Sequence, residues 1–423
     1  MRCAVVLFTR DLRVHDNPAL SAAVREAERV LPLFVLDERL LAVSARRAAL
    51  LASALADLDR SLRRLGAGLV VRRGDPVGET VRAWRACGAE AVFVAEDVSP
   101  YAVRRTRLLT AALPLRTCPG VTVLSPRAVT PADRDHYRVF TPYHRAWAAE
   151  PRRALEDVPS RLTLPDGVEP GHLPEAEPDG ETAARAALER WLVGGDRGYA
   201  ARRDDLSADA TSKLSIPLHL GLLSPLEVAA RTGSDELVRQ LAWRDFYAQL
   251  LAANPASATA DLHPRAREWT DDRDGLAAWQ EGRTGYPVVD AGMRELASTG
   301  FMHNRARMIV ASFLAKDLNV DWREGAAHFE RLLLDGDVAS NRGNWQWVAG
   351  TGVDTRPGRV INPTLQGKRH DPDGEYVRRW VPELADVPGA AVHEPWKLGA
   401  LFTGAYPAPI VDHAEAAARY RAG

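Results

Sequence analysis

Cysteine and long hydrophobic runs are scarce in this sequence. Its three cysteines, Cys3, Cys87 and Cys118, all lie in the first third of the chain, and their spacing matches no metal-binding motif. This pattern predicts a reducing compartment and excludes a zinc site built from cysteines. The N-terminal apolar run AVVLF is only about five residues long, too short for a signal-peptide core or a membrane span. We therefore expect a soluble, cytoplasmic protein that does not enter a membrane.

A strong excess of charge of either sign is also missing. The formal net charge is −1, which argues against binding a polyanion with the whole surface and restricts any nucleic-acid site to a local basic patch. Lysine is rare, so arginine is the main candidate for phosphate contacts. Hydrophobic residues make up 46% and charged residues 26% of the 423 positions. This composition is that of a globular protein, and the length predicts two domains.

The chain changes character along its length. The runs AVVLF, VLPLFVL, GLVVRR, AVFV and VTVL predict strands of a parallel sheet in an α/β domain over residues 1–130. This domain is Rossmann-like, but no GxGxxG follows its first strand, and the loop there offers Arg10 and Arg13 instead. Prolines and glycines crowd residues 159–180, and we assign 131–190 to a linker. From 191 to 423 apolar residues recur with helical spacing, which predicts a mostly helical second domain.

Two polar segments of the helical part are candidates for binding a nucleotide. The run TSKLS, residues 211–215, places hydroxyls, amides and one cation before a helical stretch. It fits a phosphate at a helix N-terminus and, equally, ordinary capping. The segment DGDVASN places Asp335, Asp337 and Asn341 near a helix start, where they could hold a ribose or the polar edge of a ring. Magnesium is the alternative ligand, weakened by the lack of a third protein ligand.

The segment MHNRARM supplies two arginines close to these carboxylates. Arg307 can pair with Asp335 inside a pocket while Arg305 faces outward to a phosphate. An ordinary amphipathic helix with a charged face is the alternative interpretation of this segment.

The run NRGNWQW places Trp345 and Trp347 two positions apart. Residues with this spacing point about 200° apart around a helix, so the two indoles must meet different environments. Packing in a core is the usual role of tryptophan. The pair therefore raises the question of which second environment the chain provides.

Five segments carry a resemblance to a known family: AWRDFY, WQEGRTGYPVVDAGMREL, STGFMHNRARMIVASFLAKDLNVDWREG, DGDVASNRGNWQW and GEYVRRWVPEL. They are similar to segments of the DNA photolyase and cryptochrome family, most of all to class I cyclobutane pyrimidine dimer photolyases. The similarity is densest from about residue 190 to 397. It implies a helical domain that binds FAD, with the fully reduced anion as the working state. It also implies light-driven electron transfer to a dimer flipped out of UV-damaged DNA.

The resemblance implies residues for each part of the flavin. The adenosine and pyrophosphate end would be held by Tyr199, Thr211, Ser212, Lys213, Leu214 and Ser215. The isoalloxazine would be lined by Arg244, Arg307, Asp335 and Asp337. Asn341 would face flavin N5, where an amide, unlike an acid, does not hand a proton to the reduced anion.

The resemblance gives the two neighbouring tryptophans separate roles. Trp345 would be the last station of an electron relay that runs from Trp269 through Trp322, and with Asn341 these form the predicted catalytic group. Trp347 and Trp243 would form opposite walls of the dimer pocket, where indoles stack on flipped bases. The predicted substrate-binding residues are Gln240, Trp243, Asn304, Arg305, Met308 and Trp347.

A few positions bear on the choice of lesion. Photolyases for the six-four photoproduct resemble HHLARH, with two histidines as proton donors, whereas this chain has Asn304 and Met308. Cyclobutane dimers need no proton transfer, so these residues favour that lesion. Gln240 stands where dimer photolyases usually have glutamate, and we expect slower repair of the same substrate.

The segment TGVDTRPGRVINP departs from the family, because Pro357-Gly358 replaces an aromatic pair and the segment is one residue shorter. Seven basic residues face four acidic ones between 341 and 380, a candidate phosphate footprint on a nearly neutral protein. The basic residues are Arg342, Arg356, Arg359, Lys368, Arg369, Arg378 and Arg379.

The α/β domain is expected to hold an antenna pigment. EDVSPYAVRRTR resembles the 8-hydroxy-5-deazaflavin type more than the folate type, with contacts from Arg10, Phe34, Arg47 and Asp97. The expected partner is UV-damaged DNA, bound by a monomer without an obligate protein partner, and no metal is expected.

Two alternatives stay open, a blue-light sensor of cryptochrome type and a six-four photolyase. Sensors commonly append long tails, and this chain ends 27 residues after Trp396, which favours repair. A dark flavin oxidoreductase or a nucleotide-binding module is disfavoured, because no second-substrate site is evident.

Overall fold

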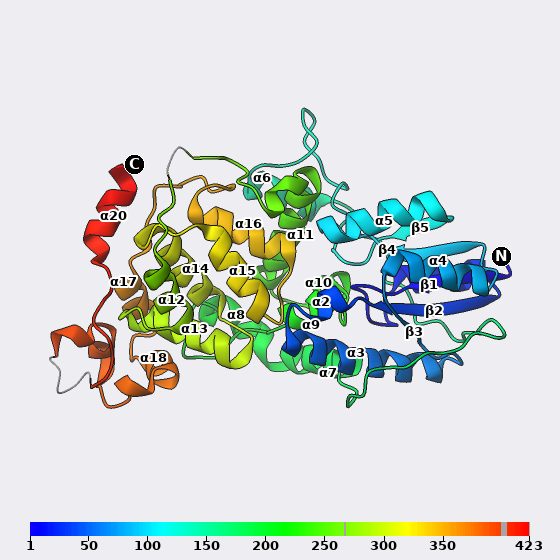
Figure 1. Ribbon diagram of the computed structural model, residues 1–423, viewed down its shortest axis with the longest axis horizontal. Helices are drawn as coiled ribbons and strands as arrows, with labels where there is room; N and C mark the ends of the chain where they lie inside the picture. The colour runs from blue at the N-terminus through cyan, green and yellow to red at the C-terminus, as the bar shows by residue number, and fades with distance from the viewer. Residues whose placement is uncertain (266–267, 399–403, 423) are drawn as a thin grey trace. The chain divides into compact units, whose positions relative to one another are not determined.

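The computed structural model describes residues 1–265, 268–398 and 404–422. The chain forms two compact units, traced in Figure 1. Unit 1 comprises Met1–Arg197 and Ser212–Pro255, and unit 2 comprises Gly198–Thr211 and Ala256–Gly423. The segment 212–255 therefore belongs with the N-terminal part of the chain.

A five-stranded parallel sheet forms the centre of unit 1 (Figure 1). Its strands are β1 (Cys3–Leu7), β2 (Arg29–Leu36), β3 (Val70–Arg73), β4 (Ala91–Ala95) and β5 (Leu115–Cys118), in the order β3-β2-β1-β4-β5. Val5 of β1 lies opposite Leu31 of β2 and Val92 of β4, and all of β1 is buried. A strand covered on both faces needs a continuous apolar run, which CAVVL supplies. The predicted parallel α/β sheet is confirmed.

One predicted strand is wrong. The run VTVL, residues 121–124, is not a strand, and the fifth strand is the more polar LRTC at the sheet edge. The backbone N–H groups of Val123 and Leu124 donate instead to the buried carboxylate of Asp245, at 3.2 and 2.9 Å. A side chain far away in sequence thus satisfies the amides that a sheet would otherwise have satisfied.

Helices cover the sheet of unit 1. Helices α4 (Pro76–Ala86) and α5 (Pro100–Ala112) pack on the face that carries Cys3, Val5 and Leu7. Other helices of this unit are α1 (Pro18–Glu26), α2 (Glu38–Leu41), α3 (Ala45–Arg64), α6 (Phe140–Ala149), α7 (Glu181–Arg190), α9 (Ser215–Leu220), α10 (Pro225–Arg231) and α11 (Asp235–Ala253), with a π-helical turn η1 (Trp191–Gly195). Residues 151–179 contain neither helix nor strand.

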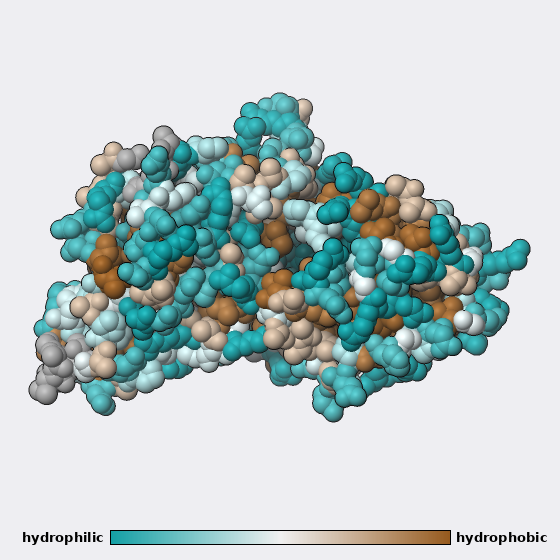
Figure 2. Space-filling model, viewed as in Figure 1, coloured by the Kyte–Doolittle hydropathy of each residue, from teal (hydrophilic) through white to brown (hydrophobic). Residues whose placement is uncertain are grey.

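The surface of the visible face is mainly hydrophilic (Figure 2). Hydrophobic side chains gather over α5, where Val103 and Leu108 are exposed.

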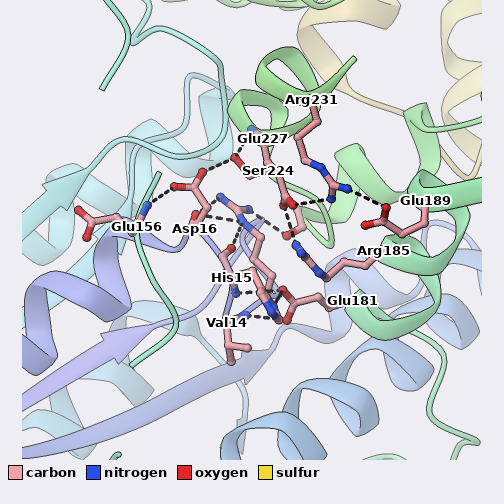
Figure 3. A network of polar contacts seen from close by, with 12 residues as sticks. Val14, His15, Asp16, Glu156, Glu181, Arg185, Glu189, Ser224, Glu227 and Arg231 are labelled. Atoms are coloured by element: carbon pink, nitrogen blue, oxygen red, sulfur yellow. Dashed lines mark hydrogen bonds and ion pairs between the residues drawn. The ribbon is translucent and has the colours of Figure 1, made fainter. Parts of the chain in front are cut away.

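The loop after β1 is held by a polar network rather than by glycines (Figure 3). Glu181, at the start of α7, accepts hydrogen bonds from the backbone N–H groups of Val14 (2.7 Å) and His15 (3.0 Å). Asp16 accepts from the hydroxyl of Ser224 and from the backbone N–H of Glu156. Arg13 is 1% exposed. Its guanidinium donates to backbone carbonyls, including those of Gly120 and Gly221. Arg13 is therefore a structural residue.

Unit 2 is built from helices around one large apolar core. The helices are α8 (Tyr199–Arg202), α12 (Arg273–Glu281), α13 (Pro287–Thr299), α14 (Asn304–Ser312), α15 (Trp322–Leu332), α16 (Val338–Ala349), α17 (Pro363–His370), α18 (Glu375–Trp380) and α20 (His413–Ala422). A π-helical turn, η4 (Phe313–Asp317), extends α14. Short 3-10 turns of unit 2 are η5 (Pro382–Leu384), η6 (Gly389–His393) and η7 (Pro395–Lys397), while η2 (Asp196–Gly198) and η3 (Pro255–Ala258) each span a boundary between the two units in the sequence. The core contains Met293, Val310, Phe313 and Trp322, each fully buried. The predicted helical domain is confirmed for this part of the chain.

Candidate functional site

In unit 2, the loop before α16 carries the predicted carboxylates, and one of them pairs with an arginine of α14. Arg307 donates from Nη2 to Asp335 Oδ2 at 2.8 Å and from Nε to the carbonyl of Met302 at 2.8 Å. The side chain of Asp335 is only 4% exposed. A buried carboxylate needs such a partner, because removing an ion from water is costly. The pairing expected from the sequence is therefore present, and it fixes Arg307 beside the start of α16.

Asp337 is the N-cap of α16. Its carboxylate accepts the backbone N–H of Ser340 at 2.8 Å, the geometry that satisfies a free amide at a helix start. One turn later, the side-chain amide of Asn341 donates to the carbonyl of Ala326 in α15 at 3.0 Å. This hydrogen bond ties α16 to α15 and fixes the direction of the Asn341 side chain.

The two tryptophans of NRGNWQW meet different environments. Trp345 is 2% exposed and lies edge-on to Trp279 (centroids 6.0 Å apart) and to Phe329 (5.1 Å). Trp347 is only partly buried, and the guanidinium of Arg359 lies 5.5 Å from its ring centroid. The predicted division between a core face and a more open face is confirmed.

A glycine admits Trp345 to its position. A Cβ added to Gly325 of α15 would lie 2.2 Å from Cη2 of Trp345, closer than any real contact. The small residue lets α15 and α16 approach at this point. Gly325 was not singled out in the sequence, because nothing near it in the chain reveals the indole that it faces.

The three tryptophans of the predicted relay belong to one apolar cluster. Trp322 is fully buried, and its Nε1 donates to Asp261 at 2.8 Å. Trp269 is partly buried against the same cluster as Trp345. Trp279, which the sequence did not single out, is fully buried and contacts Trp345 directly. The buried part of the cluster thus contains an indole, Trp279, that the predicted relay lacks.

In unit 1, α11 presents an aromatic stack. The ring of Trp243 lies parallel to Phe140 of α6, with centroids 3.6 Å apart and planes inclined by 6°. Arg244 donates to the carbonyls of Val121 and Leu218. Asp245 accepts from Val123, Leu124 and the indole N–H of Trp147. Phe140 and Asp245 were missed in the sequence, although AWRD places Asp245 beside two predicted site residues.

The TSKLS run is not an ordinary helix cap. Helix α9 begins at Ser215 with Leu214 as its N-cap, and no side chain caps it. Lys213 has a φ of 52°, in the left-handed region that side chains seldom adopt. The hydroxyl of Thr211 is buried and has no hydrogen-bond partner among the described residues. A buried hydroxyl without a partner is costly, and a ligand oxygen would satisfy it. These features fit the phosphate interpretation better than capping.

Polar side chains gather where β1, β2 and β4 of unit 1 end. Arg10 donates to Asp97 at 3.4 Å and to the carbonyl of His219 at 3.0 Å. The hydroxyl of Tyr101 donates to Asp37 at 2.7 Å, and the pKa of this tyrosine is raised, mainly by burial. Arg105 is 9% exposed, and its Nε and Nη2 have no hydrogen-bond partner among the described residues. The carboxyl ends of parallel strands are a usual place for a ligand.

Comparison with known proteins decides the family. The family model described as the FAD binding domain of DNA photolyase matches residues 237–423, and the model described as DNA photolyase matches residues 4–162. A deoxyribodipyrimidine photo-lyase of Streptomyces griseus is 49% identical over 448 residues, which cover 99% of this chain and 98% of the relative. The chain belongs to the DNA photolyase family.

Solved structures of photolyases share this fold. A bacterial class III photolyase from Agrobacterium tumefaciens is 34% identical with a TM-score of 0.91, over 100% of this chain and 97% of that one. An archaeal photolyase from Sulfolobus tokodaii, described with two FAD molecules, is 32% identical with a TM-score of 0.88, over 99% of both chains. The fold predicted from the sequence, an α/β N-terminal part and a helical FAD-binding C-terminal part, is confirmed.

The remaining predicted residues of this photolyase are placed as follows. Tyr199 is buried in α8, and Gln240 is partly buried in α11. Asn304 begins α14 and is exposed, while Met308 is partly buried. Arg305 is ion-paired with Asp204 at 2.8 Å. Phe34 is buried in β2, and Arg47 lies in the first turn of α3.

Two arginines and the one lysine of the 341–380 footprint are held by contacts within the photolyase. Arg342 pairs with Glu330 at 2.6 Å, and Lys368 pairs with Glu394 at 2.5 Å. Arg378 donates to the carbonyl of Val387 at 3.1 Å. The exposed residues Arg356, Arg359 and Arg369 are better placed to meet a phosphate.

Membrane spans and metal clusters do not occur in the described parts of the photolyase. No helix in them combines the length and apolar character that crossing a bilayer requires. Nor do they contain a group of three or more histidine, cysteine or carboxylate side chains placed to hold a metal ion.

Proposed function

We propose that this photolyase uses light to repair cyclobutane pyrimidine dimers in DNA. The observation that carries the proposal is the 49% identity, over nearly the whole of both chains, to a relative named deoxyribodipyrimidine photo-lyase. When bound, fully reduced FAD would supply the light-driven electron transfer by which the two carbon–carbon bonds of the dimer are split. The residues of the chain bind, orient and shield the reactants.

The flavin would be held by side chains with the chemistry that its parts require. The Thr211 hydroxyl and the Ser212–Ser215 backbone would meet phosphate oxygens, with Tyr199 and Lys213 beside them. Arg244, Arg307, Asp335 and Asp337 would line the isoalloxazine. Asn341 would face N5, and its amide, fixed by Ala326, offers no acidic proton there.

The damaged base pair would be received by stacking and hydrogen bonding. Trp347 and Trp243 would stack on the pyrimidines, each presenting a flat ring. Gln240 would bond the edge of a thymine, and Asn304, Arg305 and Met308 would complete the pocket. Arg356, Arg359 and Arg369 would neutralise phosphates, and binding should weaken with salt.

Refilling an oxidised flavin would use the relay from Trp269 through Trp322 to Trp345. The supporting feature is that all three indoles lie in or against one buried cluster. Trp345 at its inner end is shielded from water, with 2% of its surface exposed. Within the family we propose a class I enzyme, with class III as the alternative raised by the Agrobacterium tumefaciens structure.

The α/β part would hold an antenna of the 8-hydroxy-5-deazaflavin type. Arg10, Asp97 and the buried guanidinium of Arg105 would meet polar groups of that ring system, with Phe34 against its plane. Arg47 would complete the contacts. A second FAD is the alternative, since the photolyase of Sulfolobus tokodaii is described with two FAD molecules. Mass spectrometry of the pigments released from the purified protein distinguishes these.

We propose that residues 1–130 hold the antenna, that residues 131–190 form a linker, and that residues 191–423 bind FAD and DNA. We propose that the enzyme works in the cytoplasm as a monomer, without an obligate protein partner.

The deciding experiment uses two oligonucleotides, one with a single thymine dimer and one with a single six-four photoproduct. The purified protein is reduced, mixed with each, and split into lit and dark samples. Loss of the dimer in the light alone supports the proposal. Repair of the six-four product instead would favour that alternative, and no repair of either, with flavin bound, would favour a light sensor.

A further inference from the structure

The segment 356–359 forms a tight turn whose carbonyls point to a buried lysine. The backbone N–H of Arg359 donates to the carbonyl of Arg356 at 3.1 Å, which closes the turn. Lys316, in the π-helical turn η4, donates from Nζ to the carbonyls of Pro357 (3.1 Å) and Arg359 (2.6 Å). Lys316 is 3% exposed. A buried cation is retained only where polar groups receive it.

The C-terminal helix α20 closes over the same lysine. The ring of Tyr420 lies with its centroid 4.9 Å from Nζ of Lys316, close enough for a cation–π contact. Its hydroxyl lies 3.1 Å from the carbonyl of Ala349 and 3.3 Å from the carbonyl of Pro357. Arg265 donates to that hydroxyl at 2.9 Å. Tyr420 therefore contacts both the lysine and the turn that the lysine holds.

The other end of α20 is also anchored to η4. The first residue of the helix, His413, hydrogen-bonds through Nδ1 to the fully buried carboxylate of Asp317. Asp317 is the neighbour of Lys316 in the chain. The helix is thus attached to η4 near both of its ends, to Asp317 at its start and to Lys316 near its end.

The turn ends in a side chain that reaches the proposed DNA-binding surface. Arg359 is exposed, and its guanidinium lies 5.5 Å from the ring centroid of Trp347. The chain of contacts therefore runs from Tyr420 through Lys316 to the backbone of 357–359, and from there to Arg359 above Trp347. Every link lies within unit 2.

We propose that α20 is a positioning element for DNA binding: Tyr420 and Lys316 hold the 356–359 turn in the conformation that keeps Arg359 over Trp347. This inference rests on the proposed function, in which Trp347 stacks on a pyrimidine and Arg359 meets a phosphate. Neither Tyr420 nor Lys316 touches the DNA in this scheme. Both act through the position of Arg359.

Folding stability alone does not account for Lys316. The pKa of Lys316 is lowered to about 8, mainly by burial; Arg265 and Arg359 contribute to the lowering, and Asp354 and Asp317 oppose it. The folded state thus disfavours the charged form. For the free energy of unfolding, a buried lysine at this position is less favourable than an apolar residue of similar size. We infer that its hydrogen bonds to the 356–359 turn serve another purpose.

The test compares Tyr420→Leu, Tyr420→Phe and Lys316→Met with two matched controls. Glu415→Ala alters an exposed residue of the same helix, and Lys397→Met makes the lysine change at an exposed site. Three quantities are measured on each full-length, flavin-loaded protein. They are the Kd for a duplex with one thymine dimer in the dark, the repair rate at saturating DNA in the light, and hydrogen exchange of the Arg359 amide without DNA.

We expect Tyr420→Leu and Lys316→Met to raise the Kd about tenfold and to speed exchange at Arg359, with an unchanged rate at saturating DNA. Tyr420→Phe keeps the ring over Lys316 and should lie between wild type and Tyr420→Leu. In an Arg359→Ala background, Tyr420→Leu should raise the Kd no further, because both changes remove one contact.

Additive effects in that double variant, or faster exchange with an unchanged Kd, would overturn the inference. So would a Kd equal to that of the controls. If Tyr420→Leu fails to fold, Tyr420→Phe gives the same readouts. A wild type that binds flavin but repairs no dimer would refute the proposed function instead, and exchange at Arg359 would still show whether α20 holds the turn.

Discussion

Replacing Asp245 by asparagine tests how unit 1 fixes α11, the helix that carries Trp243. Asp245 is 1% exposed, and its carboxylate accepts hydrogen bonds from Leu124 (2.9 Å), Val123 (3.2 Å) and Trp147 (3.0 Å). These donors favour the anion, but burial outweighs them and raises the pKa of Asp245 from 3.8 to about 6. The folded state therefore binds this proton more tightly than the unfolded chain does.

The sign and size of the effect follow from that difference. Because the ionised carboxylate is disfavoured in the folded state, the free energy of unfolding falls as pH rises from about 4 through the folded pKa of about 6, and it levels off near pH 7. A pKa shift of about two units corresponds to about 3 kcal/mol over the full range. Between pH 5 and 7 the loss is about 1.3 kcal/mol, because at pH 5 the unfolded carboxyl is already ionised. Asparagine does not titrate, so Asp245→Asn escapes this loss.

The measurement is the free energy of unfolding in urea for wild type and Asp245→Asn at pH 5, 6 and 7. The difference between the two proteins should shift by about 1.3 kcal/mol in favour of the variant at pH 7. The asparagine oxygen can accept from Leu124 and Trp147, but its NH₂ would then face the N–H of Val123 at every pH, so that cost of about 1–3 kcal/mol cancels in the comparison. Asp157→Asn, at an exposed aspartate of unit 1, controls for the chemical change. Parallel curves for wild type and Asp245→Asn would refute the reasoning.

Three further predictions concern the photochemistry and the DNA. Trp345→Phe should slow light-driven reduction of the flavin while leaving repair by pre-reduced enzyme largely intact, with Trp380→Phe as the control; equal loss of both activities would contradict the relay. Trp347→Ala should weaken binding of dimer-containing DNA by about 1–3 kcal/mol, and a Kd unchanged in a dark anisotropy titration would exclude stacking there. Arg356→Ala should lower the slope of log K against log salt by about 1; the same slope in both proteins would remove Arg356 from the phosphate footprint.

The tryptophan pair shows what a sequence alone can predict. Helical geometry required Trp345 and Trp347 to face different environments, and the structure gives them different burial and different neighbours. The Arg307–Asp335 pair was also foreseen, because the two charges lie in adjacent motifs of the helical part. Local spacing and charge were enough in both cases.

Other features depend on residues far apart in the chain, and spacing does not reveal them. The run VTVL looks like a strand, yet its amides meet Asp245 more than a hundred residues later. Arg13 looks like a ligand contact, yet its guanidinium donates hydrogen bonds to backbone carbonyls from distant parts of the chain. Lys316 and Tyr420 gave no signal at all, since a buried cation under an aromatic ring is recognised only in three dimensions.

An indole has two faces, and in this protein one face of Trp243 is already covered by Phe140, with the rings nearly parallel. A planar guest, whether a nucleobase or an intercalating dye, cannot lie flat against that indole on the side that Phe140 covers. Titration with such a guest should therefore saturate at a stoichiometry of no more than one for Trp243. Removing the phenyl ring by Phe140→Ala would expose the face of Trp243 that Phe140 now covers to such a guest.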